Sequence, residues 1–371
     1  MLNRKKAVVY IIDGSPAITG AFVCARNIAR AIKEDASVVL VISKDAKIED
    51  LEIEDFAAVE RLPIRHLRRT WKAMLLYLPS LIISSVILRQ KMLRDGAKML
   101  LVNDFYLLQG PMVRWLGYRG MIITWVRINP NAFGFIPHIW LWCVQKTSNK
   151  IVSVSRYIES LLPYGLSTDL LYDGVDPKFE ADVPRRDQKS RTFVFLGNYI
   201  PGKGQDIAIE AFSYVASHCP DARLEFYGGD MGLAKNRAFL SSLKERAHSL
   251  GISAKVHFGK FADKPSSIFV GKFAALNLSR SESFSMTVLE ASASGLPVIA
   301  TRSGGPEEII ENEQTGLLIP MDDAQACAEA MLRLCKEPEW ALKMGLAGRE
   351  RVLSQFSQPS FKRHLLELLE I

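Results

Sequence analysis

The sequence lacks the features that mark disulfide-bonded or membrane-spanning proteins. Its five cysteines are odd in number and widely spaced, and they form no C-x-x-C pair. A disulfide framework or a zinc site is therefore not expected, and a reducing compartment fits best. Residues 73–88 and 128–145 carry no formal charge, but both contain proline. Neither stretch offers the about 20 mostly apolar residues that a spanning helix needs, so no transmembrane segment is predicted.

Length and composition indicate a globular protein with two domains. Hydrophobic residues make up 48% and charged residues 23% of the chain, which is ordinary for a globular protein. Single hydrophobic cores stop growing near about 250–300 residues, so 371 residues predict two domains. The first apolar run, residues 7–12, is short and ends at Asp13, and we expect a β-strand there rather than a signal peptide.

Positive charge is concentrated in the first half of the chain. The formal net charge is +7, from 47 Lys and Arg against 40 Asp and Glu. Residues 1–185 hold 25 of the basic and 18 of the acidic side chains, whereas residues 186–371 hold 22 of each. An imbalance of this kind indicates an anionic partner for the first half.

Short β-rich runs alternate with helical patterns along the chain. In the first half the candidate strands are Ala7–Ile12, Ser37–Ile42, Lys98–Val102, Met121–Val126, Ile151–Ser155 and Asp169–Tyr172. In the second half they are Thr192–Leu196, Leu224–Tyr227, Lys255–Phe258, Ala274–Leu278, Pro297–Thr301 and Leu317–Ile319. Such alternation predicts βαβ units, and hence two similar α/β lobes with parallel sheets. Ligands of open parallel sheets bind outside the carboxyl ends of the strands, so we expect the site in the cleft between the lobes.

The segment from residue 274 to 310 predicts a helix whose start could bind an anion. A polar loop follows the strand, and Ser285 is expected to cap a helix over Met286–Ser294. The N–H groups of Met286, Thr287 and Val288 would then point at the mouth of the cleft and attract negative charge.

Two carboxylates flank this predicted helix start. Glu282 lies in the loop, and Glu290 lies about one and a half turns into the helix. Carboxylates accept hydrogen bonds from hydroxyl groups, so this arrangement suits a ligand that carries phosphate together with a ribose and a hexose. The spacing alone leaves a second interpretation open, in which both residues are solvated acids that favour the helix dipole.

These residues belong to a longer set of motifs. Glu282 and Glu290 form E-x7-E within S-x-x-E-S-F-S and E-A-x-A-x-G-x-P-V-I-A-T, followed by G-G-x-x-E-I-I. The other motifs are F-L-G-N-Y-I-P-G-K-G (Phe195–Gly204), Y-G-G-D (Tyr227–Asp230), T-G-L-L-I-P (Thr315–Pro320), S-V-S-R-Y-I with Y-D-G-V-D (Ser153–Asp176) and D-G-S-P-A-I-T-G-A (Asp13–Ala21). The set resembles the retaining, GT-B fold glycosyltransferases of family 4 (glycosyl transferases group 1). The resemblance is strong over the second half of the chain and loose over the first.

The resemblance implies roles for individual residues. Glu282 would lie against the donor sugar, and Glu290 would hold the ribose hydroxyls of the nucleotide. Lys203 would contact the donor diphosphate and neutralise it as the glycosidic bond breaks, assisted by the N–H groups after Ser285. Gly20, in the turn after the first strand, would let the backbone approach the phosphates or the sugar, unless it is a plain turn glycine.

Several positions depart from the family's pattern. Directly after Gly197, where members usually have Arg, this chain has Asn198, which offers the donor phosphates only a neutral group. Ser283 and Ser285 replace the glycines of the usual E-G-F-G loop, which leaves the donor sugar open. The first-lobe histidine of many members is not evident, and Arg127 or Asn129 is expected to face the cleft instead.

For the whole chain, the resemblance implies two Rossmann-like lobes whose parallel sheets face an interdomain cleft. Residues 1–180 would form the acceptor-side lobe and residues 191–350 the nucleotide-sugar-binding lobe, joined by a linker over 181–190. Residues 351–371 would form a C-terminal helix that packs back on the N-terminal lobe.

The reaction that the resemblance implies is transfer of a sugar, with retention, from a nucleotide-sugar donor. A UDP-sugar is favoured over a GDP-sugar, and the acceptor would be a lipid-linked or cell-surface polysaccharide. Glu282, Lys203 and Arg127 would be the catalytic groups; no cofactor is expected and, since no D-x-D motif occurs, no metal. Two alternatives stay open: an epimerase or phosphorylase of the same fold, and a degenerate protein that binds sugar nucleotides without catalysis.

Most of the charge excess lies in one short stretch. Residues 61–98 contain nine basic side chains and a single acid, Asp95, and the cations bracket the apolar residues 73–88. This arrangement suits a cytoplasmic protein that binds peripherally at the anionic inner face of the cell membrane. The alternative is a buried first-lobe helix with solvated ends. Nucleic acid is not expected as a partner, because no recognised RNA or DNA motif accompanies the cations.

Overall fold

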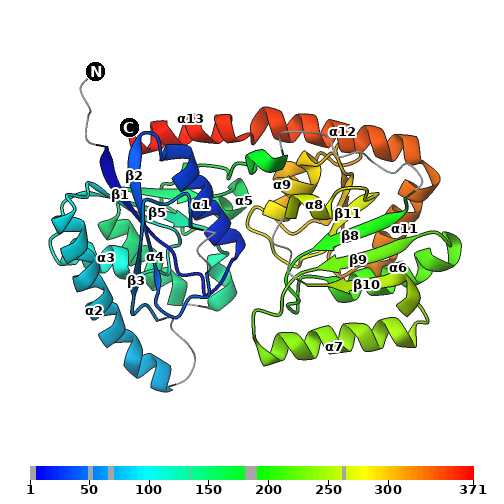
Figure 1. Ribbon diagram of the computed structural model, residues 1–371, viewed down its shortest axis with the longest axis horizontal. Helices are drawn as coiled ribbons and strands as arrows, with labels where there is room; N and C mark the ends of the chain where they lie inside the picture. Colours follow the sequence, from blue (N-terminus) through cyan, green and yellow to red (C-terminus); the bar gives the residue numbers. More distant parts are fainter. Residues whose placement is uncertain (1–5, 49–52, 66–70, 135, 180–189, 261–264) are drawn as a thin grey trace. The chain divides into compact units, whose positions relative to one another are not determined.

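The protein divides into two compact units. The computed structural model describes residues 6–48, 53–65, 71–134, 136–179, 190–260 and 265–371 (Figure 1). The first unit comprises residues 1–174 with 361–371, and the second comprises residues 175–360. The division falls a few residues before the predicted boundary at 180. Residues 181–189 of the predicted linker lie outside the described residues.

The first unit is built on a seven-stranded parallel sheet in the order β3-β2-β1-β4-β5-β6-β7 (Figure 1). Its strands are β1 (Ala7–Ile12), β2 (Ala36–Ser43), β3 (Ala58–Leu62), β4 (Met99–Val102), β5 (Met121–Val126), β6 (Lys150–Ser153) and β7 (Asp169–Leu170). The central strand β4 is buried throughout, as expected for a parallel strand covered on both faces.

Helices cover the first sheet and include the end of the chain. They are α1 (Gly20–Ile32), α2 (Trp71–Arg94), α3 (Gln109–Trp115), α4 (Ile136–Thr147), α5 (Arg156–Ser160), the 3-10 helix η2 (Pro130–Phe133) and α13 (Gln358–Leu369). From Phe361 onward α13 belongs to this unit. There the Lys362 ammonium lies 3.3 Å from the Asp35 carboxylate, and Lys150 Nζ donates to the carbonyl of Leu368 at 2.7 Å.

The second unit contains a six-stranded parallel sheet in the order β10-β9-β8-β11-β12-β13. Its strands are β8 (Thr192–Leu196), β9 (Arg223–Tyr227), β10 (Val256–Gly259), β11 (Ala274–Asn277), β12 (Val298–Thr301) and β13 (Leu317–Ile319). Its helices are α6 (Gln205–His218), α7 (Ala234–Ser249), α8 (Pro265–Ile268), α9 (Met286–Ala293), α10 (Pro306–Ile309), α11 (Ala324–Lys336) and α12 (Pro338–Gln355), with the 3-10 helices η3 (Pro177–Phe179) and η4 (Ser253–Lys255). The two parallel sheets confirm the predicted class of two α/β lobes.

The core of the second unit follows from the predicted periodicities. Phe193 and Phe195 on β8 and Phe226 on β9 are fully buried, and Phe195 packs against Phe226 with ring centroids 5.6 Å apart. On α6, Phe212 and Val215 enter the same core, three positions apart as on one face of a helix. Apolar residues that recur with strand and helix periods therefore meet between the sheet and its helices.

Strand β3 was not predicted from the sequence. Its residues, Ala58 to Leu62, include Glu60 and Arg61, and only Leu62 is buried. It lies at the edge of the first sheet, beside β2. An edge strand has a neighbouring strand on one side only, so it can carry charged side chains. The continuous apolar run that identifies a central strand is therefore absent from its sequence.

One further finding concerns the helices. Among the residues that the structure describes, no helix is long and apolar enough to cross a membrane.

Candidate functional site

The chain order of both sheets reverses between two central strands. In the second unit the neighbours at this point are β8 and β11, and in the first unit they are β1 and β4. Loops leave the carboxyl ends of such a pair in opposite directions, which opens a crevice where open α/β sheets bind their ligands. The loops that follow β8 and β11 are therefore the candidate site of the second unit.

Gly204 allows these two loops to approach closely. Its φ of 87° is left-handed, and a Cβ there would lie 2.2 Å from the carbonyl oxygen of Leu278, at the end of β11. The loops are joined directly as well, since the Arg280 N–H donates to the Gly202 carbonyl at 3.0 Å. The K-G turn of the sequence thus holds Lys203 against the loop that carries Glu282.

Lys203 and Glu282 form an ion pair across the two loops. Lys203 Nζ lies 2.6 Å from Glu282 Oε1, and Ser279 Oγ donates to the same oxygen at 2.6 Å. The side chains are 36% and 14% exposed, so solvent reaches the pair. A pair at such exposure contributes only about 0–1 kcal/mol to stability, and either partner can change to another ligand at little cost.

The backbone fixes the position of Glu282. Its N–H donates to the Ser303 carbonyl at 3.0 Å, and its carbonyl accepts from the Gly305 N–H at 2.8 Å. Both partners lie in the loop after β12, the neighbour of β11. The carboxylate is therefore held by three loops rather than by its own loop alone.

The start of α9 differs in one respect from the prediction. Ser285 occupies the N-cap position with φ 85° and ψ 83° and makes no side-chain capping bond, so the predicted capping by its hydroxyl is wrong. In this left-handed conformation Ser285 Oγ instead accepts from Asn277 Nδ2 at 3.1 Å. The first backbone bond of the helix runs from Leu289 to Ser285 at 3.1 Å. The N–H groups of Met286, Thr287 and Val288 precede that bond and have no carbonyl within the helix to pair with.

Asn277, which we did not predict, organises this helix start. It is the last residue of β11 and is buried, and its Nδ2 also donates to Thr287 Oγ1 at 2.8 Å. One amide thus ties the strand to both Ser285 and Thr287. The available signal was a single polar residue at the end of an otherwise apolar strand, Ala274 to Asn277.

Gly197 and Asn198 lie at the start of the β8 loop, as predicted, and the fold uses their polar groups. Asn198 Oδ1 accepts from the Gly229 N–H at 3.0 Å, and Gln205 Nε2 donates to the Asn198 carbonyl at 2.9 Å. A Cβ at Gly228 would lie 2.1 Å from the Gly197 carbonyl oxygen, which explains the first glycine of the pair after β9. Contact of Gly197 or Asn198 with a donor phosphate stays a prediction.

Two further charged residues of the second unit are Glu290 and Arg280. Glu290 is buried on α9. Arg280, two residues before Glu282, pairs with Asp322 at 2.7 Å on the exposed surface. The role that the resemblance gives to Glu290 stays a prediction.

Arg127, at the end of β5, lies in a closed network of the first unit. Its Nη1 lies 2.8 and 3.0 Å from the two Asp173 oxygens, and its Nε donates to Asn103 Oδ1 at 2.8 Å. Both side chains of the ion pair are only 5% exposed. Burial disfavours the charge of Arg127, but Asp173 outweighs this effect and raises the pKa of the guanidinium. A catalytic role for Arg127 stays a prediction, and its observed contacts are those of a structural ion pair.

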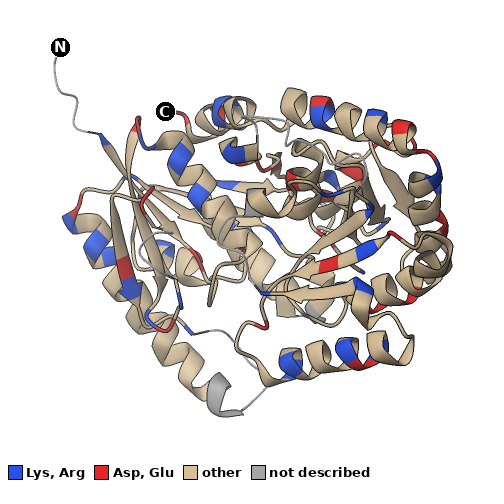
Figure 2. Cartoon of the chain, turned by 45° about the vertical axis from the view of Figure 1, so that its right-hand side comes forward, with Lys and Arg blue, Asp and Glu red and all other residues tan. Residues whose placement is uncertain are grey.

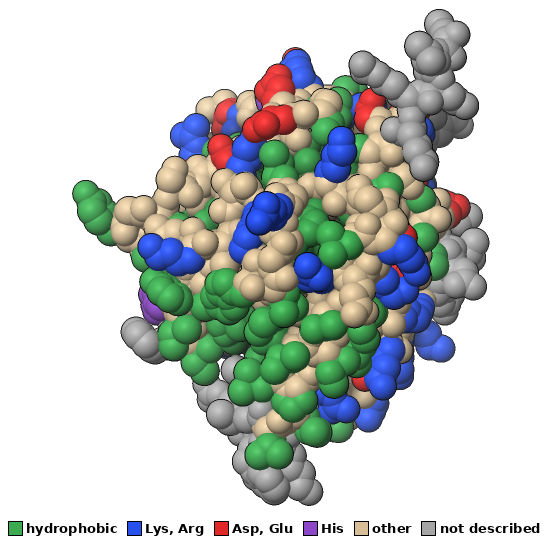
Figure 3. All heavy atoms as spheres, turned by 90° about the vertical axis from the view of Figure 1, so that its left-hand side faces the viewer, with side chains coloured by type: hydrophobic (Ala, Val, Ile, Leu, Met, Phe, Trp, Pro, Cys, Tyr) green, Lys and Arg blue, Asp and Glu red, His purple; other side chains and the backbone are tan. Residues whose placement is uncertain are grey.

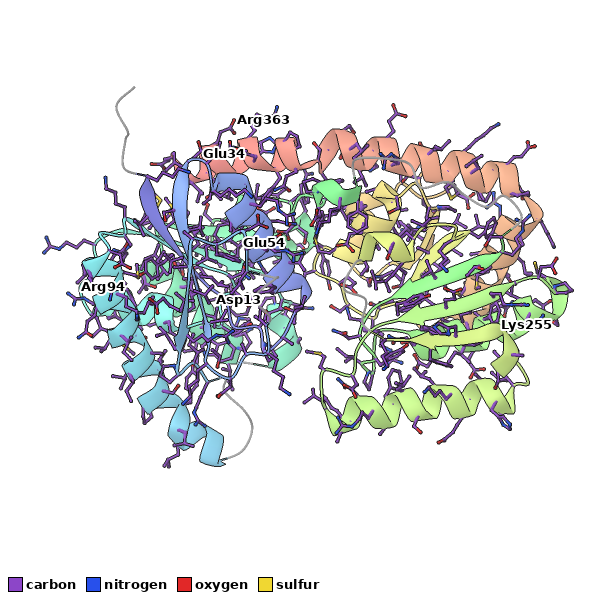
Figure 4. All side chains as sticks on the ribbon, in the orientation of Figure 1. Asp13, Glu34, Glu54, Arg94, Lys255 and Arg363 are labelled. Carbon is purple, nitrogen blue, oxygen red and sulfur yellow. The ribbon has the colours of Figure 1, made fainter. Side chains whose placement is uncertain are left out.

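Polar groups also gather at the point where the first sheet reverses. Asn103 Nδ2 donates to Asp13 Oδ2 at 2.5 Å, which joins the end of β4 to the end of β1 (Asp13 is labelled in Figure 4). Asp104 Oδ1 accepts the N–H groups of Phe105 and Arg127 at 2.9 and 3.1 Å. Burial raises the pKa of Asp104 to about 7, against the effect of these donors.

Gly20 lies at the first residue of α1 rather than in the turn before it. Thr19 caps this helix, with its hydroxyl accepting from the Phe22 N–H at 3.3 Å. A Cβ at Gly20 would meet nothing within 4 Å, so packing within the described residues does not require glycine there. Its predicted contact with the donor stays a prediction.

The described residues contain no group of three or more His, Cys, Asp or Glu side chains that could hold a metal ion. Independence from metal stays a prediction.

Comparison with known proteins shows which family and which solved folds the chain is similar to. Residues 177–351 match the model of the family described as glycosyl transferases group 1. A GDP-mannose-dependent alpha-(1-6)-phosphatidylinositol monomannoside mannosyltransferase of Mycobacterium tuberculosis is 30% identical over 219 residues, 56% of this chain and 54% of that protein. Mannosylfructose-phosphate synthase of Agrobacterium fabrum is 28% identical over 214 residues, 57% of this chain and 47% of that protein. The chain thus spans about half the length of these curated relatives.

Solved structures of similar fold cover the whole chain. HepE of Anabaena in complex with UDP-glucose aligns with a TM-score of 0.84 and 16% identity, covering 98% of this chain and 99% of that one. WaaG, a glycosyltransferase involved in lipopolysaccharide biosynthesis, aligns with a TM-score of 0.74 and 14% identity over 97% and 99% of the two chains. These likenesses confirm the predicted GT-B fold.

Proposed function

Because residues 177–351 belong to the glycosyl transferases group 1, we propose that this protein is a retaining glycosyltransferase. It moves a sugar from a nucleotide-sugar donor to a lipid-linked or cell-surface polysaccharide acceptor. The observation that carries the proposal is the solvent-accessible pair of Lys203 and Glu282 at the point where the second sheet reverses. It offers a cation for a diphosphate and a carboxylate for a sugar hydroxyl side by side.

When a donor binds, Lys203 and Glu282 can each exchange the other for a group of the donor. In the free protein Glu282 neutralises Lys203, and the two groups are joined at 2.6 Å. A donor diphosphate brings two negative charges to the Lys203 ammonium, and a sugar hydroxyl offers Glu282 a hydrogen bond in return. Both groups thus keep a partner, and the protein already holds them in place when the donor arrives.

In the reaction we propose, the acceptor oxygen attacks the anomeric carbon from the face that the phosphate leaves. The bond from the anomeric carbon to the phosphate oxygen breaks, and the bond to the acceptor oxygen forms. The acceptor's hydroxyl proton passes to the departing phosphate oxygen. Lys203 and the first N–H groups of α9 stabilise the negative charge that grows on the diphosphate. Glu282 orients the sugar through its hydroxyl groups.

We assign binding of the nucleotide part of the donor to Glu290 and to the glycine-containing loop after β8. Glu290 would accept hydrogen bonds from the ribose hydroxyls, and Gly197 would leave room for the diphosphate beside Lys203. The relative with 30% identity is named for GDP-mannose, and the Anabaena neighbour was solved with UDP-glucose. Both donors therefore belong in the first test, and the acceptor class rests on a relative that is named for a phosphatidylinositol mannoside.

Calorimetric titration with UDP-glucose and GDP-mannose tests the donor site. We expect one of them to bind, and Glu290→Ala to weaken that binding more than about tenfold, since a carboxylate bonded to hydroxyls contributes about 1.5–3 kcal/mol. Glu329→Ala, at an exposed position of α11, is the matched control and should bind like the unaltered protein. Unchanged binding in Glu290→Ala would overturn the assignment of the nucleotide.

Donor hydrolysis without an acceptor separates an enzyme from a protein that only binds. Slow release of free sugar from the bound donor, with retained anomeric configuration, is expected of the transferase. Binding without any release of sugar would favour the non-catalytic alternative, and formation of an epimeric nucleotide sugar would favour the epimerase.

A further inference from the structure

Helix α2 of the first unit carries apolar side chains on its solvent-facing side as well as on its buried side, where Leu88 and Met92 enter the core. Its buried face includes Ser80, Ser84 and Ser85, whereas its exposed face carries leucine and isoleucine. The largest of these exposures are 68% for Leu75 and 59% for Leu78. Soluble helices place such residues toward the core and serine toward water. The buried serines are partly satisfied within the unit, because Gln109 Nε2 donates to Ser84 Oγ at 3.2 Å.

The exposed apolar residues of α2 lie on one face. Leu75, Ile82 and Leu93 are separated by seven and eleven positions, which are spacings that return to the same side of a helix. Their neighbours on that side include Leu78 and Ile83. The alternative interpretation of residues 73–88, a buried helix with solvated ends, therefore does not hold for this face.

The neighbouring helices extend the same surface. Helix α3 packs between α2 and α4, and Trp115 at its end is 56% exposed. On α4, Ile139 and Trp142 lie one turn apart and both are exposed. We call the whole set the α2–α4 face. Its exposed members are Leu75, Leu76, Leu78, Ile82, Ile83, Leu93, Trp115, Leu116, Ile136, Ile139 and Trp142. Figure 3 shows hydrophobic side chains gathered on this side of the first unit, with Lys and Arg at the margin.

Charge on these helices has one sign. Residues 71–94, 109–119 and 136–147 include seven Lys and Arg and no Asp or Glu. In Figure 2, α2 accordingly carries blue and no red. Arg119 and Lys146 are exposed and follow Trp115 and Trp142 by four residues each. A ligand of this face therefore has to be apolar and anionic together.

Two of these seven cations are paired with carboxylates. Glu60 is paired with Lys91 at 2.8 Å, and Asp95 is paired with Arg94, which is labelled in Figure 4, at 2.8 Å. Arg89 lies beside the turn after α3, since its Nη2 would be 4.0 Å from a Cβ at Gly117. Arg89, Arg119 and Lys146 thus add positive charge around the apolar residues.

We propose that the α2–α4 face binds the surface of an anionic phospholipid bilayer. Aliphatic side chains and tryptophan enter the boundary between headgroups and acyl chains, while the surrounding cations meet the lipid phosphates. A second copy of the chain fits less well, because two identical faces would bring like charges together. The surface lies on the first unit and needs no donor, so it goes beyond the proposed transfer reaction.

Flotation with vesicles tests the apolar part of the proposal. The unaltered protein should float with vesicles of phosphatidylcholine and phosphatidylglycerol and stay behind with phosphatidylcholine alone. The double variant Ile139→Ser with Trp142→Ser should lose about 100-fold in vesicle affinity, about tenfold for each apolar side chain that no longer enters the lipid. The control is Val270→Ser with Leu346→Ser, two exposed apolar positions of the second unit, which should bind normally.

Charge reversal tests the electrostatic part. Arg119→Glu with Lys146→Glu should weaken binding at least about 25-fold, since each basic residue near an anionic surface contributes about fivefold. Lys235→Glu with Lys343→Glu makes the same change in net charge at exposed positions of the second unit and should have little effect. Equal losses in both variants would show an effect of net charge alone and would overturn the assigned face.

Two outcomes would reject the proposal as a whole. One is flotation that does not depend on anionic lipid or on the α2–α4 face. The other is a dimer, found by sedimentation without lipid, that the Ile139 and Trp142 substitutions dissociate while vesicles never bind. Donor titration of the same variants keeps the two proposals apart. Intact donor binding without vesicle binding rejects only the membrane surface, and vesicle binding without donor binding rejects only the proposed transfer.

Discussion

Each unit holds an ion pair at the carboxyl edge of its sheet, and the two pairs differ in access to solvent. Arg127 and Asp173 of the first unit are both only 5% exposed, and the guanidinium contacts both oxygens of the carboxylate. Lys203 and Glu282 of the second unit are 36% and 14% exposed and meet through one oxygen. A closed pair holds strands together, whereas an open pair can exchange one partner for a ligand.

The difference follows from where each partner comes from. Arg127 extends from the end of β5 and Asp173 from the segment after β7, and Asn103 and Trp125 enclose the guanidinium. Lys203 and Glu282 come from the loops after β8 and β11, where the order of the second sheet reverses, and solvent reaches both. Both pairs consist of a cation beside a carboxylate. The pair of the first unit therefore stabilises the fold, whereas the pair of the second unit is available to bind a ligand.

The largest expected effect is loss of the closed pair. Arg127→Met leaves the Asp173 charge buried without its partner, so we expect the free energy of unfolding to fall by about 3–5 kcal/mol. Urea denaturation measures this change. Lys203→Met is the matched variant in the other unit and should change stability by less than about 1 kcal/mol. Equal losses in the two variants would remove the contrast between a closed and an open pair.

The buried carboxyl beside Arg127 should make stability depend on pH. The folded pKa of Asp104 is raised to about 7 from an ordinary 3.8. Between these values the folded protein keeps a proton that the unfolded chain releases, so this group's contribution to stability is lost as pH rises from about 4 to 7. Asp104→Asn removes the titration and keeps an acceptor for the two N–H donors. Relative to the unaltered protein, its unfolding free energy should increase by about 2–4 kcal/mol between pH 4 and pH 8. A difference that does not vary with pH would contradict the buried titration.

Loss of the open pair's cation should act on catalysis rather than on folding. Lys203→Met removes the charge that stabilises the leaving diphosphate, and we expect turnover to fall by about 100-fold. Initial rates at saturating donor measure the effect, with the melting temperature as the control for folding. Lys235→Met, at an exposed position of α7, should transfer at the normal rate.

The smallest expected effect tests whether a diphosphate replaces Glu282 as the partner of Lys203. Glu282→Gln removes the carboxylate that occupies Lys203, so a nucleoside diphosphate without its sugar should bind about threefold more tightly. Sugar transfer should fall at the same time, because the group that orients the sugar is weakened. Calorimetric titration with UDP and GDP measures the first change. Weaker binding of both nucleotides would show that Glu282 supports the diphosphate site instead of competing for it.

Much of the fold could be predicted because strands and helices leave apolar patterns that span only a few residues. Apolar runs such as Met99 to Val102 and the helical spacing from Ile207 to Val215 mark buried strands and helices without any knowledge of neighbours. Strand β3 was not predicted because an edge position tolerates the charged residues Glu60 and Arg61. The capping role of Ser285 was wrong because the backbone there is left-handed, and its hydroxyl turns to Asn277 on the strand.

The sequence by itself determined the two parallel α/β lobes, the order of the motifs and the positions of Lys203 and Glu282, because these depend on periods and spacings within a few residues. The tertiary structure decided that these two residues, 79 positions apart, form a pair, and that Arg127 is enclosed by Asp173. It also decided that α2 buries Ser84 and Ser85 while Leu75 and Leu78 stay exposed. A helix that is apolar on several sides does not specify which side its neighbours cover. Burial is set by those neighbours, which the chain brings together only on folding.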